Sequence, residues 1–150
     1  MNINSGNSSV SYDKQRYEGG FFLTASAISI QKITQISIPV TDVKRSVDFY
    51  EKTLGLPVLY SEANMALLDC SGIRLLLSLP ETPTFDHPSS TVYFQVEDLE
   101  GSCHKMTSNG VEFMSKPHKI AEFNGYAVWM AFFYDPDRNI HALTREIALS

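Results

Sequence analysis

The sequence has few cysteines, no long apolar run and no excess of basic residues. No stretch is apolar for long enough to span a bilayer, so we predict no membrane-spanning segment. Two cysteines, Cys70 and Cys103, cannot build a disulfide framework, which favours a reducing cytoplasm. The 12 Lys and Arg residues are scattered and the net charge is −5, so we expect no nucleic-acid partner.

The composition suits one globular domain that follows an N-terminal extension. The chain has 150 residues and 43% hydrophobic content, enough for one domain with a core. Residues 1–20 are rich in Asn, Ser and Gly and have no apolar period that could bury a face. We therefore predict a poorly ordered extension over residues 1–30 and a single domain over residues 31–150.

The domain contains two copies of one pattern. "ISIPVTDVKRSVDFYEKTLGL" in the first half parallels "VYFQVEDLEGSCHKMTSNGV" in the second. In each copy a strand of period two leads to an Asp that suits a helix N-cap, then to apolar residues at helical spacing, and then to a Gly. The N-caps are Asp42 and Asp98, and the glycines are Gly55 and Gly110. Cys103 falls on the apolar helix face, so it is a core residue in this interpretation.

Two strands and a turn complete each copy. "MALLDCSGIRLLLSL" resembles "AFFYDPDRNIHALTR", with Asp69 or Asp135 opening the turn. These aspartates are interpreted as turn-formers rather than catalysts, because Asp bonds its own turn and Pro136 presets the backbone. The sequence thus predicts an α+β fold of two β-α-β-β-β modules, at about residues 33–80 and 91–147, forming a curved sheet around a cavity.

Alternation along the first strand of each module predicts which face meets the helices. Ile36 and Ile38 share one face, and Ser37 with Gln35 lies on the other. The matching outer set in the second module contains Thr91 and Tyr93 beside Gln95. Mixed polar and aromatic groups on a concave face predict a ligand pocket, and a plain solvated face is the alternative.

The paired units, with "ITQISIPVTDVKRSVDFYEKTLGL", "VYFQVEDLEG" and "WMAFFYDPDRNIHALTRE", resemble the vicinal oxygen chelate superfamily. That superfamily includes glyoxalase I, extradiol dioxygenases, and fosfomycin- and bleomycin-resistance proteins. The resemblance covers Ile33 to Ile147, and its motifs indicate a fold rather than a reaction. Arg138 stands where the family's turn usually has Gly. The resemblance also implies a homodimer.

Metal enzymes of this superfamily take ligands from four strand positions, which correspond here to Gln35, Leu76, Thr91 and Ala142. Leu and Ala have no donor atoms, and a stable site needs three or four ligands. The resemblance therefore implies a protein without the family's metal and without a cofactor.

Four histidines could supply other chemistry. His87 lies in a Pro-flanked loop that we expect to be solvated, His104 should lie on the outer side of a helix, and His141 should point away from the cavity. Only His118 lies in a segment expected to overhang the pocket, where it could form hydrogen bonds or act as acid or base.

The stretch "YAVWMAFFY" predicts a strand buried on both faces. The resemblance places Val128, Met130 and Phe132 toward the cavity, with Trp129 and Phe133 behind the sheet.

Two function classes remain open. One is a metal-free protein that binds an amphipathic or aromatic small molecule, which we favour because no nucleophile–base pair is visible. The other is a small-molecule enzyme, a lyase, isomerase or dioxygenase, including one whose metal ligands are not recognised. The predicted ligand-binding residues are Gln35, Ser37, Leu76, Thr91, Tyr93, His118, Met130, Phe132 and Ala142.

Overall fold

The structure of the protein is a computed structural model that describes residues 27–150. The chain divides into a unit of Met1–Lys32 and a unit of Ile33–Ser150. Residues 27–32 are exposed and have no regular secondary structure. The second unit carries the helices and strands described below. The predicted poor order of residues 1–20 concerns a segment outside the described residues.

The first module begins with a strand and returns to it after a helix and a hairpin. Its elements are β1 (Gln35–Pro39), α2 (Val43–Asp48), the π-helical η2 (Phe49–Thr53), β2 (Val58–Ser61), β3 (Met65–Cys70) and β4 (Ile73–Ser78). The strands form one sheet in the order β1-β4-β3-β2, with β1 parallel to β4. A linker follows that contains the short 3-10 helix η3 (Pro83–Phe85).

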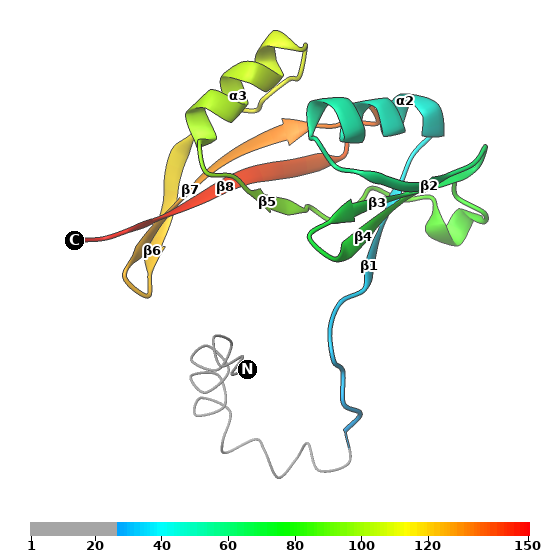
Figure 1. Ribbon diagram of the computed structural model, residues 1–150, viewed down its shortest axis with the longest axis horizontal. Helices are drawn as coiled ribbons and strands as arrows, with labels where there is room; N and C mark the ends of the chain where they lie inside the picture. The colour runs from blue at the N-terminus through cyan, green and yellow to red at the C-terminus, as the bar shows by residue number, and fades with distance from the viewer. Residues whose placement is uncertain (1–26) are drawn as a thin grey trace. The chain divides into compact units, whose positions relative to one another are not determined.

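The second module repeats this plan. Its elements are β5 (Tyr93–Gln95), α3 (Leu99–Ser108), β6 (His118–Phe123), β7 (Tyr126–Tyr134) and β8 (Ile140–Ala148). The strands form a second sheet in the order β5-β8-β7-β6, and β5 runs parallel to β8 (Figure 1). In each module a helix lies in the connection between the two parallel strands, because parallel strands need a long crossover connection. The predicted α+β fold of two β-α-β-β-β modules is confirmed.

The helix boundaries follow the local chemistry of the sequence. The Asp42 side chain accepts from the Arg45 N–H at 3.0 Å, and Asp98 caps α3 in the same way at 2.9 Å. Gly55 and Gly110 adopt φ of 75° and 89°, the left-handed region predicted for the residues after the helices. One difference is the end of the first helix, where the Leu54 N–H bonds the Phe49 carbonyl in a π-helical turn.

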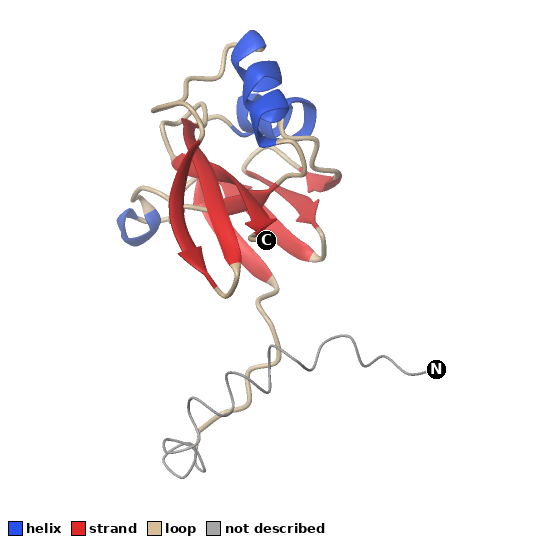
Figure 2. Ribbon diagram, turned by 90° about the vertical axis from the view of Figure 1, so that its left-hand side faces the viewer, coloured by secondary structure: helices blue, strands red, loops and turns tan. Residues whose placement is uncertain are grey.

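The helices α2 and α3 lie on the same side of the strands (Figure 1 and Figure 2). Ile38 and Tyr50 are fully buried in a cluster beneath α2, and Phe133 is fully buried in a second cluster beneath α3. Phe49 and Phe94 pack against both clusters, so the modules share one continuous core. The predicted inward face of β1 is confirmed. Over residues 27–150 the structure holds no helix with the length and apolarity to cross a membrane.

Candidate functional site

A cavity of about 370 Å³ opens on the side of the first sheet that faces away from α2. β1, β3 and β4 supply Ser37, Met65 and Leu76, and the linker supplies Phe85 and His87. Ser37 and Leu76 are register partners on β1 and β4, so their side chains emerge together on this face. Sheet and linker thus enclose a space within the range of small-molecule sites.

The lining combines an apolar surface with a few polar groups. Leu76 and Met65 are apolar, while the hydroxyls of Ser37 and Ser78 lie at the same sheet surface. Further lining residues are Pro39, Leu79, Pro80, Glu81, Phe85 and His87. This composition can bury an apolar ligand body and bond its polar end.

A second group of predicted site residues lies together on the second sheet. Tyr93 and Phe132 are both register partners of Ala142, on its two sides. Their rings meet edge to face with centroids 6.0 Å apart. Met130 is next along β7 on the same face, and His118 is its partner on β6. The structure therefore gathers five of the predicted residues into one surface.

These two groups do not line one cavity in the single chain. The cavity of Ser37 and Leu76 contains no residue of the second sheet. Gln35 accepts a hydrogen bond from Arg74 Nε at 3.1 Å, and Thr91 lines another depression that also contains Tyr93. A single pocket lined by all nine predicted residues is therefore not formed within one chain, and a ligand-binding role for each remains a prediction.

Of the histidines, His118 does not line the cavity within one chain, so its contact with a ligand stays a prediction. His118 is exposed on β6, and its Nδ1 donates to the Lys116 carbonyl at 3.0 Å. His104 is exposed on α3, as predicted. His87 is exposed as predicted, yet it lines the cavity together with Phe85. Sequence reasoning missed this linker, although its Pro-flanked aromatic residue was a visible indication of an ordered loop.

The four positions that hold metal in the family's enzymes do not fit a metal here. Leu76 and Ala142 have no donor atom, and Ala142 is fully buried beside Tyr93 and Phe132. The Gln35 amide oxygen already accepts from Arg74. Residues 27–150 contain no group of three or more His, Cys, Asp or Glu side chains arranged to hold an ion. No step of a mechanism is therefore assigned to a metal.

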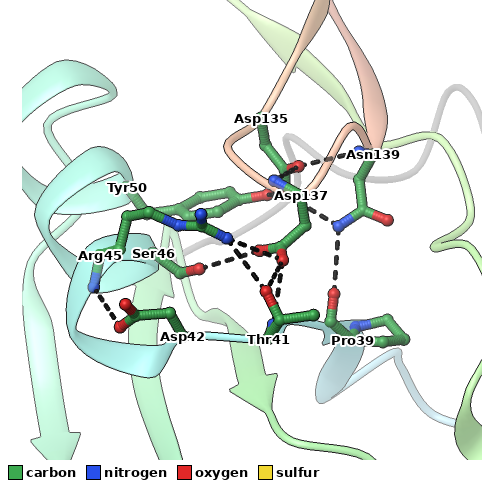
Figure 3. Close-up of polar contacts among 9 residues, drawn as sticks. All are labelled: Pro39, Thr41, Asp42, Arg45, Ser46, Tyr50, Asp135, Asp137 and Asn139. Atoms are coloured by element: carbon green, nitrogen blue, oxygen red, sulfur yellow. Dashed lines mark hydrogen bonds and ion pairs between the residues drawn. The ribbon is translucent and has the colours of Figure 1, made fainter.

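The "DPDRN" turn of the second module connects to the start of α2 in the first (Figure 3). Asp137 accepts from the Thr41 N–H at 3.0 Å, from Arg45 Nη2 at 3.0 Å and from the Ser46 hydroxyl at 3.2 Å. Its side chain is only 8% exposed, so these bonds are shielded from water. The turn thus binds the residue before the Asp42 cap and two side chains of α2 from a distant part of the chain, and Ser46 is buried in this contact.

Asn139 in the same turn holds the linker that lines the cavity. Its Oδ1 accepts from the Ser89 N–H at 3.0 Å, and its Nδ2 donates to the Pro39 carbonyl at 3.1 Å and to Asp135 at 2.9 Å. Pro39 is itself a cavity residue. The turn therefore fixes the end of β1 and the end of the linker with respect to each other.

A buried polar chain lies on the helix side of the second sheet. The Val92 N–H donates to Nδ1 of His141 at 3.1 Å, so the proton of the neutral ring is on Nε2, which donates to the Tyr50 hydroxyl at 2.9 Å. That hydroxyl donates to Asp135 at 2.7 Å. Burial lowers the pKa of His141, against the attraction of Asp135. Burial, and then Asp135, raise the pKa of Tyr50. His141 points away from the cavity, as predicted.

Residues 32–142 match the sequence profile of the Glyoxalase/Bleomycin resistance protein/Dioxygenase superfamily. The chain belongs to this superfamily. It is 31% identical over 123 residues to the uncharacterized protein YraH of Bacillus subtilis strain 168, covering 73% of this chain and 94% of that protein. The predicted superfamily is thereby confirmed.

Solved structures share the fold. An integron cassette protein from the mobile metagenome of V. cholerae is 22% identical, with a TM-score of 0.66, over 78% of this chain and 96% of that one. TnmS3, an antibiotic binding protein from Streptomyces sp. CB03234, is 23% identical, with a TM-score of 0.59, over 77% of this chain and 96% of that one. At these identities the likeness concerns the fold alone.

Proposed function

We propose that this superfamily member binds an amphipathic or aromatic small molecule, without a metal, in the cavity between the first sheet and the linker. The observation that carries the proposal is the lining, because Leu76 and Met65 form an apolar surface with the Ser37 and Ser78 hydroxyls beside it. The fold that it shares with TnmS3, an antibiotic binding protein, supports a binding role. Both cysteines are free, which fits the cytoplasm, where we propose that the protein resides.

The cavity sets the scale of affinity. Burying roughly 150 to 250 Å² of aromatic ligand surface at about 25 cal/mol per Å² contributes on the order of 4 to 6 kcal/mol before ordering costs. Micromolar binding requires about 8 kcal/mol. Hydrogen bonds to the Ser37 and Ser78 hydroxyls are the groups available to supply the difference.

We further propose that the protein is a two-fold homodimer. Among the described strands, β1 pairs only with β4 and β5 only with β8, so each has an edge that no described strand covers. Tyr93, at the edge of the second sheet, is 53% exposed. A second copy could cover these edges and bring its Tyr93 and Phe132 surface to the cavity. Light scattering at micromolar concentration should give twice the chain mass of 16.8 kDa, and the chain mass itself would contradict the dimer.

Binding can be tested by a thermal-stabilisation screen of small molecules followed by calorimetry on the best ligand. We expect one site per chain and a negative heat-capacity change. Leu76→Glu places a charge in the apolar lining and should abolish binding, while Leu59→Glu, at an exposed position of β2, should leave it unchanged. Equal binding by both variants would place the site elsewhere.

The same experiment separates binding from catalysis. Recovery of unaltered ligand supports the binding protein, whereas chemically converted ligand supports the enzyme alternative. Phe132→Ala and Ala142→Glu should weaken binding if the second sheet of a partner contributes to the cavity.

We also expect no stoichiometric divalent metal in the purified protein after dialysis. About one equivalent of Zn, Ni, Mn or Fe per chain, resistant to brief chelation, would contradict the metal-free proposal.

A further inference from the structure

The cavity carries charge of only one sign. Among the lining residues within 27–150, Glu81 is the single acidic one, and none is Lys or Arg. Glu81 is exposed, so its carboxylate lies where the cavity meets solvent. The linker adds Asp86 close by, and no Lys or Arg occurs between Arg74 and Lys105. The entrance of the cavity is therefore negative.

The nearby basic residues are already engaged. Arg138 lines an adjoining depression that shares His87, but its guanidinium bonds Glu112 at 2.6 Å and lies 3.9 Å from the centre of the Tyr134 ring. Arg74 lies on the same face of β4 as Leu76, yet it does not line the cavity and donates to Gln35. These partners reduce the attraction that either cation could offer to an anionic ligand.

The uncharged groups of the linker also suit a ligand that donates hydrogen bonds. Nδ1 of His87 lies 3.0 Å from the Pro88 carbonyl, which can only accept, so the proton of the neutral ring is on Nδ1 and Nε2 remains an acceptor. Phe85 is 59% exposed and presents an aromatic ring in the same wall. A carboxylate, a ring nitrogen acceptor and an aromatic face together form a favourable environment for an ammonium group.

We infer that the ligand is a cationic amphiphile. Its apolar body contacts Leu76 and Met65, and its protonated amine lies beside Glu81, Phe85 and His87. This inference rests on the proposed function, since it concerns the same cavity. It adds the chemical class of the ligand and excludes carboxylates and phosphates of the same size as preferred ligands, because they would meet an unbalanced negative entrance.

Three fluorescent probes with one apolar body test the inference: 2-naphthylethylamine, 2-naphthylethanol and 2-naphthylacetate. The wild-type protein should bind the amine about two- to fivefold more tightly than the alcohol, as expected for an exposed ion pair, and the acetate most weakly. Glu81→Gln should reduce amine affinity to that of the alcohol and leave the alcohol unchanged. Glu97→Gln, an exposed glutamate outside the cavity lining, is the matched control and should change neither.

Ionic strength provides an independent measurement. The preference for the amine should shrink between about 0.01 M and 1 M salt, because salt screens exposed charges. Equal binding of amine and alcohol by both wild type and Glu81→Gln would overturn the cationic ligand and leave the cavity as a binding site. If none of the three probes binds, the proposed function is overturned and this inference with it.

Discussion

The Tyr50 hydroxyl joins the two modules through a buried hydrogen-bond chain, so its removal has a calculable cost. Tyr50→Phe keeps the ring in the core and deletes only the oxygen between His141 and Asp135. Asp135 retains other donors, the N–H groups of Asp137 and Asn139. His141 retains no other acceptor for its Nε2 proton among its hydrogen bonds, so that proton becomes buried and unpaired.

Two contributions add. Losing the charged hydrogen bond to Asp135 costs about 1.5 to 3 kcal/mol, and leaving the His141 proton unpaired costs about 1 to 3 kcal/mol. Shared relaxation makes the sum smaller than the two separate values, so we expect a loss of about 3 kcal/mol in the free energy of unfolding. This is a large part of the 5–15 kcal/mol that is typical of a folded domain. The melting temperature should fall by roughly 6 to 12 °C.

Urea denaturation followed by circular dichroism measures this loss. Tyr60→Phe is the matched control, because Tyr60 is 52% exposed and its hydroxyl donates to exposed Glu62 at 3.0 Å. The control should change the free energy of unfolding by less than about 0.5 kcal/mol. A Tyr50→Phe variant no less stable than the control would show that the buried chain does not stabilise the fold.

Further predictions concern pH, the contact of Asp137 with the start of α2, the turn at Arg138 and the N-terminal segment. Because burial lowers the pKa of His141, the unfolded chain binds more protons than the folded chain does. The stability that neutral His141 contributes is therefore complete above the unfolded histidine pKa of about 6.5, and it decreases as pH falls through the lower folded pKa. Urea titrations at several pH values should show this decrease for wild type and for His104→Gln, and a smaller one for His141→Phe. Asp137→Ala removes the acceptor that joins the turn to Thr41 and to two side chains of α2 and should cost about 1 to 3 kcal/mol, whereas Asp48→Ala, which removes an exposed ion pair, should cost less than about 1 kcal/mol. Arg138 has φ of 66°, so Arg138→Gly should be nearly neutral in urea denaturation and Arg138→Val destabilising by about 2 kcal/mol; equal stability would argue against the left-handed turn. Limited proteolysis should remove residues 1–20 and leave a core from about residue 28, and resistance of that segment would show that it is docked.

Much of the fold followed from local patterns. A short polar side chain such as Asp caps a helix by bonding an N–H two or three residues ahead of it, so Asp42 and Asp98 could be identified from sequence alone. Gly55 and Gly110 were identifiable because few other residues accept a positive φ. Alternation located Ile38 in the core, and helical spacing located Cys103 there. Each of these features depends on residues that are neighbours along the chain.

The candidate site depended on contacts that no local pattern contains. The sequence predicted a binding role for Phe132, which stays a prediction, and it missed Phe85 in the linker, which lines the cavity over the first sheet. Tertiary packing decides which segment covers a sheet face, because the alternation of side chains along a strand specifies a face without specifying what covers it. The sequence placed Asp137 only in a turn, and the tertiary structure made it the hydrogen-bond acceptor for Thr41 and Ser46, 96 and 91 residues away. A hydrogen bond between such distant residues forms only after both modules share one core, so its partners are fixed by the packed chain and not by either segment.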